Sequence, residues 1–309
     1  MNKSFHANKR TVRKYLFVAS ILVLPMISFL FLYVIVNFNS FALAFQKADF
    51  YGNLSFAGLQ NFKNFFNGVK NDGYVWNTIV NSLKLWWINF LITMPLYLIF
   101  SYYVYKKFVG EKAFSIVVML PSIVSTFIYA LVYMKFVQSP LQGLLGKIGV
   151  EDFPNIIDRR NSTPKLMFIN NVFFSCWLSF GSSILVYSNA MRAIDHEVIE
   201  SANLDGASDS RQFFHIVLPL IWPTITTFVV TGVATMFTGS GSLLIFYDSS
   251  APAAIQGFSY YVTHTLKFSN GDQSGYPMVA ASGLIISLMT MPVVFGTKWL
   301  MQKLDKTEE

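Results

Sequence analysis

The chain has 309 residues, of which 53% are hydrophobic and only 13% charged, with a net charge of +7 and a mean hydropathy of +0.46. Soluble domains carry about a quarter charged residues, so this composition excludes a soluble globular protein and favours one surrounded by lipid. The positive charge is interpreted as a signal of membrane orientation, and no nucleic-acid partner is expected. The single cysteine, Cys176, excludes a disulfide within the chain.

Apolar runs long enough to cross a bilayer recur along the chain, since about 20 residues suffice for a spanning helix. A basic tail, 1–14, precedes the first run, which is longer than the apolar core of a secretory signal peptide and is expected to remain as a span. We predict an all-α membrane protein with a transmembrane domain over 15–304 and a short tail at 305–309. The six predicted transmembrane helices lie at about 15–36, 78–105, 113–136, 166–191, 220–247 and 277–301.

Individual residue types refine two of these spans. Trp86 and Trp87 are expected toward a membrane interface of the second span, because tryptophan is enriched at the level of the headgroups. Gly232, Gly239 and Gly241 are expected to break the fifth span.

Basic residues are unevenly distributed over the two sides that six spans define. One side holds the basic N-terminal tail, Lys106, Lys107, Arg192 and Arg211 in short loops, and the C-terminal lysines. The opposite loops are longer and hold fewer basic residues. Because positive residues mark the cytoplasmic side, both termini are predicted to be cytoplasmic in a multi-pass membrane protein.

A charged, soluble-looking segment, 195–219, separates the fourth and fifth predicted spans. Asp195 can cap a first short helix, and Gly206 suits the bend after it, because glycine adopts positive φ at no steric cost. Ser208 can cap a second helix. Pro219 suits the first turn of the next membrane helix, where its missing N–H costs nothing. Such a loop between spans is expected to be presented to a partner in the water.

The sequence contains no pattern typical of a catalytic or metal site. The phosphate-binding pattern G-x-x-x-x-G-K-[ST] is absent, so the chain is not expected to hold ATP itself. The four histidines are far apart and none forms H-E-x-x-H, and no G-x-S-x-G serine elbow occurs. We therefore expect no catalytic residue, no metal ligand and no cofactor bound by this chain.

Neutral polar side chains occur inside the fourth, fifth and sixth predicted spans. One interpretation is that serine, threonine and glycine let helices pack closely in lipid. The other is a polar translocation path for a neutral, hydroxyl-rich solute, because an ion or proton path would need ionisable residues. The cores of the spans carry almost none, since Lys84 and Lys135 lie near helix ends and can reach the interface.

Ten residues of the 195–219 loop carry a family resemblance. Nine of them fit the pattern E-A-A-x-x-D-G-A, then F seven residues after the glycine, then I-x-L-P, and the tenth, Ser201, replaces the first alanine of the triplet. The nine are Glu200, Ala202, Asp205, Gly206, Ala207, Phe213, Ile216, Leu218 and Pro219. This segment resembles the EAA loop of ABC importer permeases, although Asp195 stands where a proline often precedes that loop. The segments 58–66 and 139–149 are also similar to parts of sugar-importer permeases.

The resemblance extends over about 15–304 and implies a type I ABC importer (MetI-like) permease fold. In that family the EAA loop is the cytoplasmic coupling helix, which docks on an ATPase subunit. On this resemblance, Glu200 and Gly206 keep the coupling helix shaped and seated, and Phe213 packs the loop against the helices of the permease itself. Asp205 either caps the second helix or bonds a basic residue of the ATPase.

The same resemblance implies partners and a substrate class. The partners are a second permease subunit, expected to be a different chain, two ATPase subunits that hold ATP and Mg, and an extracytoplasmic solute-binding protein. The expected substrate is a sugar, an oligosaccharide or a polysaccharide-derived glycan. Candidate residues of its path are Trp177, Ser179, Ser182, Tyr187, Thr235 and Thr238. The alternatives are an ABC importer permease for a non-sugar solute and a membrane scaffold that moves nothing.

Overall fold

The structure, a computed structural model, describes residues 3–49, 52–149, 154–239, 241–268 and 273–305. Of the two predicted tails, residues 1–2 and 306–309 lie outside the described residues. The chain divides into two compact units, which are described separately. The first unit comprises Met1–Phe66 and Ser269–Ile285, and the second comprises Asn67–Phe268 and Ile286–Glu309.

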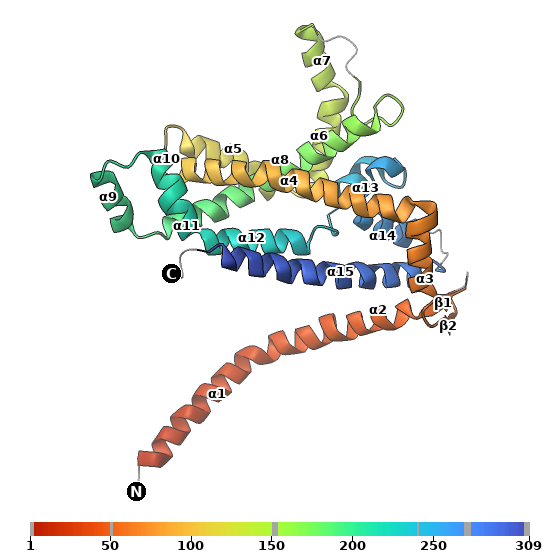
Figure 1. The fold of residues 1–309 in the computed structure, drawn as a ribbon, viewed down its shortest axis with the longest axis horizontal. Helices are drawn as coiled ribbons and strands as arrows, with labels where there is room; N and C mark the ends of the chain where they lie inside the picture. Colours follow the sequence, from red (N-terminus) through yellow and green to blue (C-terminus); the bar gives the residue numbers. More distant parts are fainter. Residues whose placement is uncertain (1–2, 50–51, 150–153, 240, 269–272, 306–309) are drawn as a thin grey trace. The chain divides into compact units, whose positions relative to one another are not determined.

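The first unit begins with a long apolar helical stretch (Figure 1), formed by α1 (Lys3–Ser28), the π-helical turn η1 (Phe29–Ile35) and α2 (Val36–Ala44). Its part Thr11–Ala44 reaches a mean hydropathy of 2.6, and no residue of its most apolar window is buried. A helix that is apolar and exposed on every side requires lipid around it. The stretch contains the first predicted span, 15–36.

A short hairpin follows this helix in the first unit. Strands β1 (Gln46–Ala48) and β2 (Leu54–Phe56) pair antiparallel, with Lys47 opposite Ser55. Helix α3 (Gln60–Asn67) closes the hairpin, because the Asn61 side-chain amide donates hydrogen bonds to the carbonyl oxygens of Ala44, at 2.8 Å, and Gln46, at 2.6 Å.

The second unit is built mainly from helices. The longest are α4 (Tyr74–Tyr105), α8 (Pro164–Arg192) and α15 (Tyr276–Lys303), the last of which belongs to this unit from Ile286 onward. The shorter elements are η2 (Gly68–Asp72), α5 (Glu111–Ile123), α6 (Thr126–Gln138), α7 (Pro140–Lys147), α9 (His196–Leu204), α10 (Asp209–Gln212), η3 (Phe213–Val217), α11 (Leu218–Leu220), α12 (Trp222–Ala234), α13 (Gly241–Tyr247), η4 (Ala253–Ile255) and α14 (Phe258–Lys267).

Helix α8 is central to this unit and packs against both α4 and α5. Its contact with α5 depends on Gly181, where an added Cβ would lie 2.1 Å from the carbonyl oxygen of Val118. No side chain fits in that space, so glycine allows the two backbones to approach. Small residues serve this purpose wherever helices associate in lipid.

The helices account for four to six membrane crossings. Thr11–Ala44, α4, α8 and α15 are each long and apolar enough to span a bilayer, and two bent helix pairs raise the number to six if each pair forms one span. The predicted spans 78–105, 166–191 and 277–301 coincide with α4, α8 and α15 to within four residues at each end.

The third predicted span, 113–136, is not one continuous helix. It divides into α5 and α6 at Val124 and Ser125, which are extended at ψ 143° and 131°, and the helical axis bends by 107° there. Pro121 contributes to the break, because proline removes one helical hydrogen bond and its ring crowds the carbonyl oxygen four residues earlier. The apolar pattern across 113–136 continues through this break and conceals it.

The fifth predicted span, 220–247, is also divided. Helix α12 ends at Ala234, and α13 does not begin until Gly241. Gly232 was expected to contribute to the break, but it lies inside α12 and faces the Trp86 indole. The helix ends instead where Thr235 and Thr238 turn their hydroxyl groups onto the carbonyl oxygens of Thr231 and Thr235, a bonding pattern that competes with helix continuation.

Pro219 does not begin the next membrane helix, contrary to the sequence-based prediction. It lies near the end of the bent partner Asp209–Leu220, and the following helix, α12, begins at Trp222 with Pro223 in its first turn. A proline can be accommodated at this position inside the helical stretch because the π-helical turn η3 lies just before it. In that turn the Leu218 N–H bonds to Phe213, five residues back, and the wider turn makes room for the proline ring.

Candidate functional site

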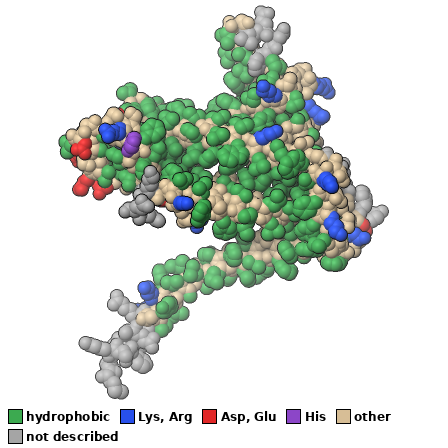
Figure 2. All heavy atoms as spheres, in the orientation of Figure 1, with side chains coloured by type: hydrophobic (Ala, Val, Ile, Leu, Met, Phe, Trp, Pro, Cys, Tyr) green, Lys and Arg blue, Asp and Glu red, His purple; other side chains and the backbone are tan. Residues whose placement is uncertain are grey.

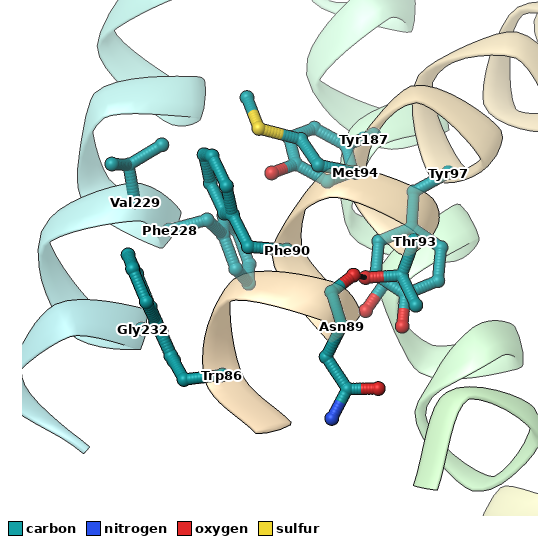
Figure 3. A pocket seen from close by; sticks show the side chains of 11 residues that line it. Trp86, Asn89, Phe90, Thr93, Met94, Tyr97, Tyr187, Phe228, Val229 and Gly232 are labelled. Carbon is teal, nitrogen blue, oxygen red and sulfur yellow. Dashed lines mark hydrogen bonds between the residues drawn. The ribbon is translucent and has the colours of Figure 1, made fainter. Parts of the chain in front are cut away.

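A pocket of about 180 Å³ lies between α4, α8 and α12 (Figure 3). Helix α4 contributes one face of its surface, at positions three or four residues apart, while α8 and α12 close the other sides. The lining residues are Trp86, Asn89, Phe90, Thr93, Met94, Tyr97, Ser183, Tyr187, Phe228, Val229 and Gly232. All eleven are neutral, so the pocket offers aromatic rings, hydroxyl groups and one amide without a fixed charge.

The aromatic walls of the pocket are held by ring contacts and one hydroxyl pair. The Trp86 and Phe90 rings stack at 5.3 Å between centroids with planes 13° apart, and the Tyr187 ring of α8 packs on the Phe228 ring of α12 at 5.1 Å between centroids. The Tyr97 hydroxyl lies 2.6 Å from the Ser179 hydroxyl. These contacts fix the orientation of the rings before any solute is present.

A second cavity, of about 300 Å³, shares Asn89 with the first pocket. Its other lining residues include Thr126, Ser175, Ser179 and Ser242. The Cys176 thiol donates to Asn89 Oδ1 at 2.9 Å, which holds the Asn89 side chain at the boundary of the two cavities. Hydroxyl and amide groups therefore continue from one cavity to the next.

The six predicted path residues are divided among several places in the structure. Tyr187 is buried and lines the first pocket, and Ser179 lines the second cavity. Ser182 is exposed and donates to the Ser179 carbonyl oxygen at 3.2 Å. Trp177 is 41% exposed and packs on Tyr129, Tyr133 and Phe173 instead. Thr235 and Thr238 lie in the turn after α12 and line neither of these two cavities.

The sequence-based prediction missed the contribution of α4. Trp86 was expected at a membrane interface, but it lies well inside α4, on the wall of the first pocket. Its neighbour Trp87 is 51% exposed and does not line that pocket. A signal was present, because polar and aromatic residues recur along α4 at positions 86, 89, 90, 93 and 97. That spacing puts them on one face of a helix.

The 195–219 loop forms two short helices joined by a bend, as predicted from its caps. The Asp195 side chain accepts from the Glu197 N–H at the start of α9. The Ser208 hydroxyl accepts from the Arg211 N–H at the start of α10. Between the two helices Gly206 has a φ of +75°, a left-handed conformation that glycine adopts most readily.

Asp205 does not cap the second helix, so that alternative for its role is wrong. It is the C-cap residue of α9 at φ −74°, whereas Ser208 has the extended backbone that an N-cap requires. Asp205 is exposed. The remaining alternative, a bond to a basic residue of a partner, stays a prediction.

The other predicted coupling residues separate into a buried and an exposed group. Ala202 and Phe213 are buried, and the Phe213 ring packs on Tyr102 of α4 at 4.8 Å between centroids. Glu200 is exposed, with the His196 ring nitrogen 3.7 Å away. The further exposed residues are Ser201 and Gly206, and Ala207, Ile216, Leu218 and Pro219 are half-buried. Figure 2 shows acidic side chains gathered over α9.

Metal binding has no structural support in the described part of the chain. No group of three or more His, Cys, Asp or Glu side chains is placed there to hold a metal ion.

Long apolar helices and an uncharged pocket among them define a multi-pass membrane protein. The chain belongs to the binding-protein-dependent transport system inner membrane component family, whose model matches residues 73–307. Members of this family are permease subunits of transporters and not enzymes.

Individual relatives extend the likeness over most of the chain. A probable ABC transporter permease from Bacillus subtilis, YurN, is 26% identical over 302 residues, which cover 93% of this chain and 96% of the relative. The arabinooligosaccharides transport system permease AraP of the same organism is 30% identical over 211 residues, covering 66% of this chain and 63% of the relative. The sn-glycerol-3-phosphate transport system permease UgpA of Escherichia coli O157:H7 is 25% identical and covers 81% of each chain.

The fold is that of a solved transporter. A chain in the crystal structure of a bacterial ABC transporter involved in the import of the acidic polysaccharide alginate superposes with a TM-score of 0.77 at 18% identity, covering 97% of this chain and 100% of that chain. A second structure of the alginate transporter, in complex with a pentasaccharide-bound periplasmic protein, gives a TM-score of 0.75 at 20% identity, covering 97% and 98% of the two chains.

Proposed function

We propose that the chain is a permease subunit of an ATP-driven, solute-binding-protein-dependent importer for a sugar, an oligosaccharide or a polysaccharide-derived glycan. The observation that carries this proposal is the uncharged pocket between α4, α8 and α12. Aromatic rings stack on the faces of sugar rings, and hydroxyl and amide groups exchange hydrogen bonds with sugar hydroxyl groups. The names of relatives such as AraP support the same substrate class.

The proposal includes a topology of six spans with both termini in the cytoplasm. The two bent pairs, α5 with α6–α7 and the stretch Asp209–Leu220 with α12, each count as one span in this topology. The basic residues near the termini, together with Lys106, Lys107 and Arg192 on the same side, support the orientation. The loop then lies in the cytoplasm and is the EAA coupling helix, with Glu200 and Asp205 exposed toward a partner.

The proposed partners are a second permease subunit, two ATPase subunits and an extracytoplasmic solute-binding protein. ATP and Mg are bound by the ATPase subunits in this proposal. This chain forms one half of the translocation path. The relative UgpA, a glycerol-phosphate permease, favours a second candidate, the import of a small anionic solute. The neutral lining of the pocket is an argument against that candidate, because an anion would be met by arginine or lysine.

Isolation of the chain from its native membrane in a mild detergent tests the proposal, with copurifying proteins identified by mass spectrometry. We expect a Walker-A ATPase, a second multi-span permease and a solute-binding protein. That binding protein is then titrated with neutral oligosaccharides, uronic-acid oligosaccharides and sn-glycerol-3-phosphate. If the binding protein binds only sn-glycerol-3-phosphate, the proposed substrate is a small anionic solute and not a sugar. Recovery of the chain without any ATPase, under conditions that preserve known importers, would favour a scaffold that moves nothing.

A further inference from the structure

The three helices that wall the first pocket have different connections to the 195–219 loop. Helix α8 ends at Arg192, directly before the loop, and α12 begins at Trp222, directly after it. A movement of the loop is therefore transmitted to these two helices directly along the backbone. Helix α4 ends at Tyr105, about one hundred residues earlier in the sequence, and still provides six of the eleven lining residues. A movement of the loop can reach α4 only through side-chain contacts.

Such contacts occur at the C-terminal end of α4. Lys106 Nζ lies 2.8 Å from Asp209 Oδ1 and donates to Gln212 Oε1 at 2.7 Å. The Tyr102 hydroxyl donates to the Asp209 carbonyl oxygen at 2.9 Å, and its ring packs on Phe213. Hydrogen bonds that involve a charged group are stronger than neutral ones. The Lys106 side chain is only 16% exposed, so solvent screens these bonds less than it screens a surface ion pair.

Gln212 also holds the loop together. Its side chain is 1% exposed, and Nε2 donates to Asn203 Oδ1 at 2.7 Å and to the Ala207 carbonyl oxygen at 2.8 Å. One amide, on the last residue of α10, thus joins α10 to the end of α9 and to the bend. The oxygen of the same amide accepts from Lys106. The end of α4 is therefore bonded to the residue that holds the parts of the loop together.

We propose that Lys106 and Gln212 are positioning residues that couple movement of the 195–219 loop to α4, so that the α4 wall of the pocket moves with the loop. The inference rests on the proposed function, in which ATPase subunits move this loop. Tyr97, the nearest α4 residue in the pocket, lies nine residues from Lys106, about 14 Å along the helix. A displacement at Lys106 therefore reaches Tyr97 before it meets Pro95, the proline inside α4.

A labelling experiment on the whole complex tests this coupling. In a Cys176→Ala background, Met94→Cys reports on the α4 wall and Ser183→Cys reports on the α8 wall, and each variant is isolated with its ATPase subunits. The rate at which a small maleimide labels each cysteine is measured without nucleotide and after trapping with ATP and vanadate. With Lys106 present, trapping is expected to change the labelling rate at both reporters.

Lys106→Met is expected to reduce the trapping-dependent change at Met94→Cys about tenfold, while the change at Ser183→Cys persists. Lys106→Arg keeps the charge and is expected to restore the response of Met94→Cys. Lys107→Met is the matched control, because it removes a charge one residue later from an exposed side chain, and both reporters should then respond as in the parent.

Three results would contradict the coupling. They are an undiminished response of Met94→Cys in Lys106→Met, an equal loss at both reporters, and the same loss in Lys107→Met. If Lys106→Met does not assemble, Asp209→Asn removes the ion pair from a half-exposed carboxylate and must weaken the Met94→Cys response selectively. A parent complex that hydrolyses no ATP contradicts the proposed function itself, and this inference with it.

Discussion

Trp86 and Trp87 are adjacent in the chain but have different surroundings. The Trp86 ring stacks on Phe90 and lines the first pocket, whereas Trp87 meets these two rings edge to face, does not line the pocket and is 51% exposed. A sugar ring in the pocket would contact only the first of these indoles. The pair therefore offers two substitutions of equal size, of which one removes a wall of the proposed path.

We expect Trp86→Ala to raise the apparent KM for uptake of the identified oligosaccharide about three- to tenfold, because one aromatic contact contributes about 0.5–1.5 kcal/mol. Uptake is measured in proteoliposomes with the complete transporter. Trp87→Ala is the control and should leave KM within about twofold of the parent. Equal effects of the two substitutions would mean that the pocket does not receive the solute.

Gly206 has a φ of +75°, with no atom within 4 Å of an added Cβ. A side chain would therefore find space but would strain the backbone by about 1–2 kcal/mol. We expect Gly206→Val to insert normally, to retain basal ATP hydrolysis and to lose solute-stimulated hydrolysis. Gly143→Val on α7, where the added Cβ also meets nothing and φ is not positive, should behave as the parent. Unchanged stimulation in Gly206→Val would rule out a role of this bend in coupling.

At the scale of residues, the sequence predicts those caps and bends that depend only on residues a few positions away in the chain. Asp195, Ser208 and Gly206 act through bonds and torsions within a few positions, so their roles as caps and bend could be predicted. Trp86 could not be placed by the same reasoning, because an indole suits both an interface and a pocket. Its neighbour on α12, Gly232, is more than a hundred residues away in the chain.

Helices α5 and α8 touch through Gly181, and this contact can be tested at the scale of elements. An added Cβ would lie 2.1 Å from the backbone oxygen of Val118, so one of the helices must shift. We expect Gly181→Ala to destabilise the folded protein by about 1–3 kcal/mol, seen as a lower midpoint of thermal unfolding in detergent. Gly283→Ala on α15, where the added Cβ meets nothing within 4 Å, should leave the midpoint unchanged.

The breaks in two predicted spans show where hydropathy stops being informative. Hydrophobicity averaged over a window registers the apolar character of 113–136 and of 220–247, but it does not register backbone direction. The direction changes at Val124 and Ser125 after Pro121, and again at Thr235 after α12. Both turns have local causes, Pro121 in the first and the Thr235 and Thr238 hydroxyl groups in the second, which an average over a hydropathy window does not register.

The topology of the whole molecule depends on whether the two bent pairs cross the membrane. Six crossings, with the N-terminus inside, put Arg159 outside and Arg211 in the cytoplasm. If neither pair crosses, four spans remain and the two arginines exchange sides. We expect Arg159→Cys, in a Cys176→Ala background, to react with a membrane-impermeant maleimide in intact cells.

Arg211→Cys should react only after the cells are opened, and both arginines are exposed, so burial does not prevent labelling. The reverse pattern would establish the four-span topology and would remove the 195–219 loop from the cytoplasm.

Among the properties of the whole molecule, family membership was the one that the sequence predicted best. The EAA-like spacing over 200–219 lies within the region 73–307 that the family model matches. In the proposed function a partner recognises the shape of this short, charged segment. The residues that line the solute path are harder to identify from the sequence, because neutral residues that line a cavity are the same types that let helices pack.

The length of the first helical stretch has a consequence for the height of the hairpin above the bilayer. In the proposed topology the first span begins after Arg13 and Lys14, and about 20 residues cross the hydrocarbon, which brings the chain to about Ile35. The nine residues of α2, Val36–Ala44, then rise about 14 Å further, more than the thickness of one headgroup layer. Strands β1 and β2 consequently stand in the water outside the membrane, within reach of a soluble protein that arrives there.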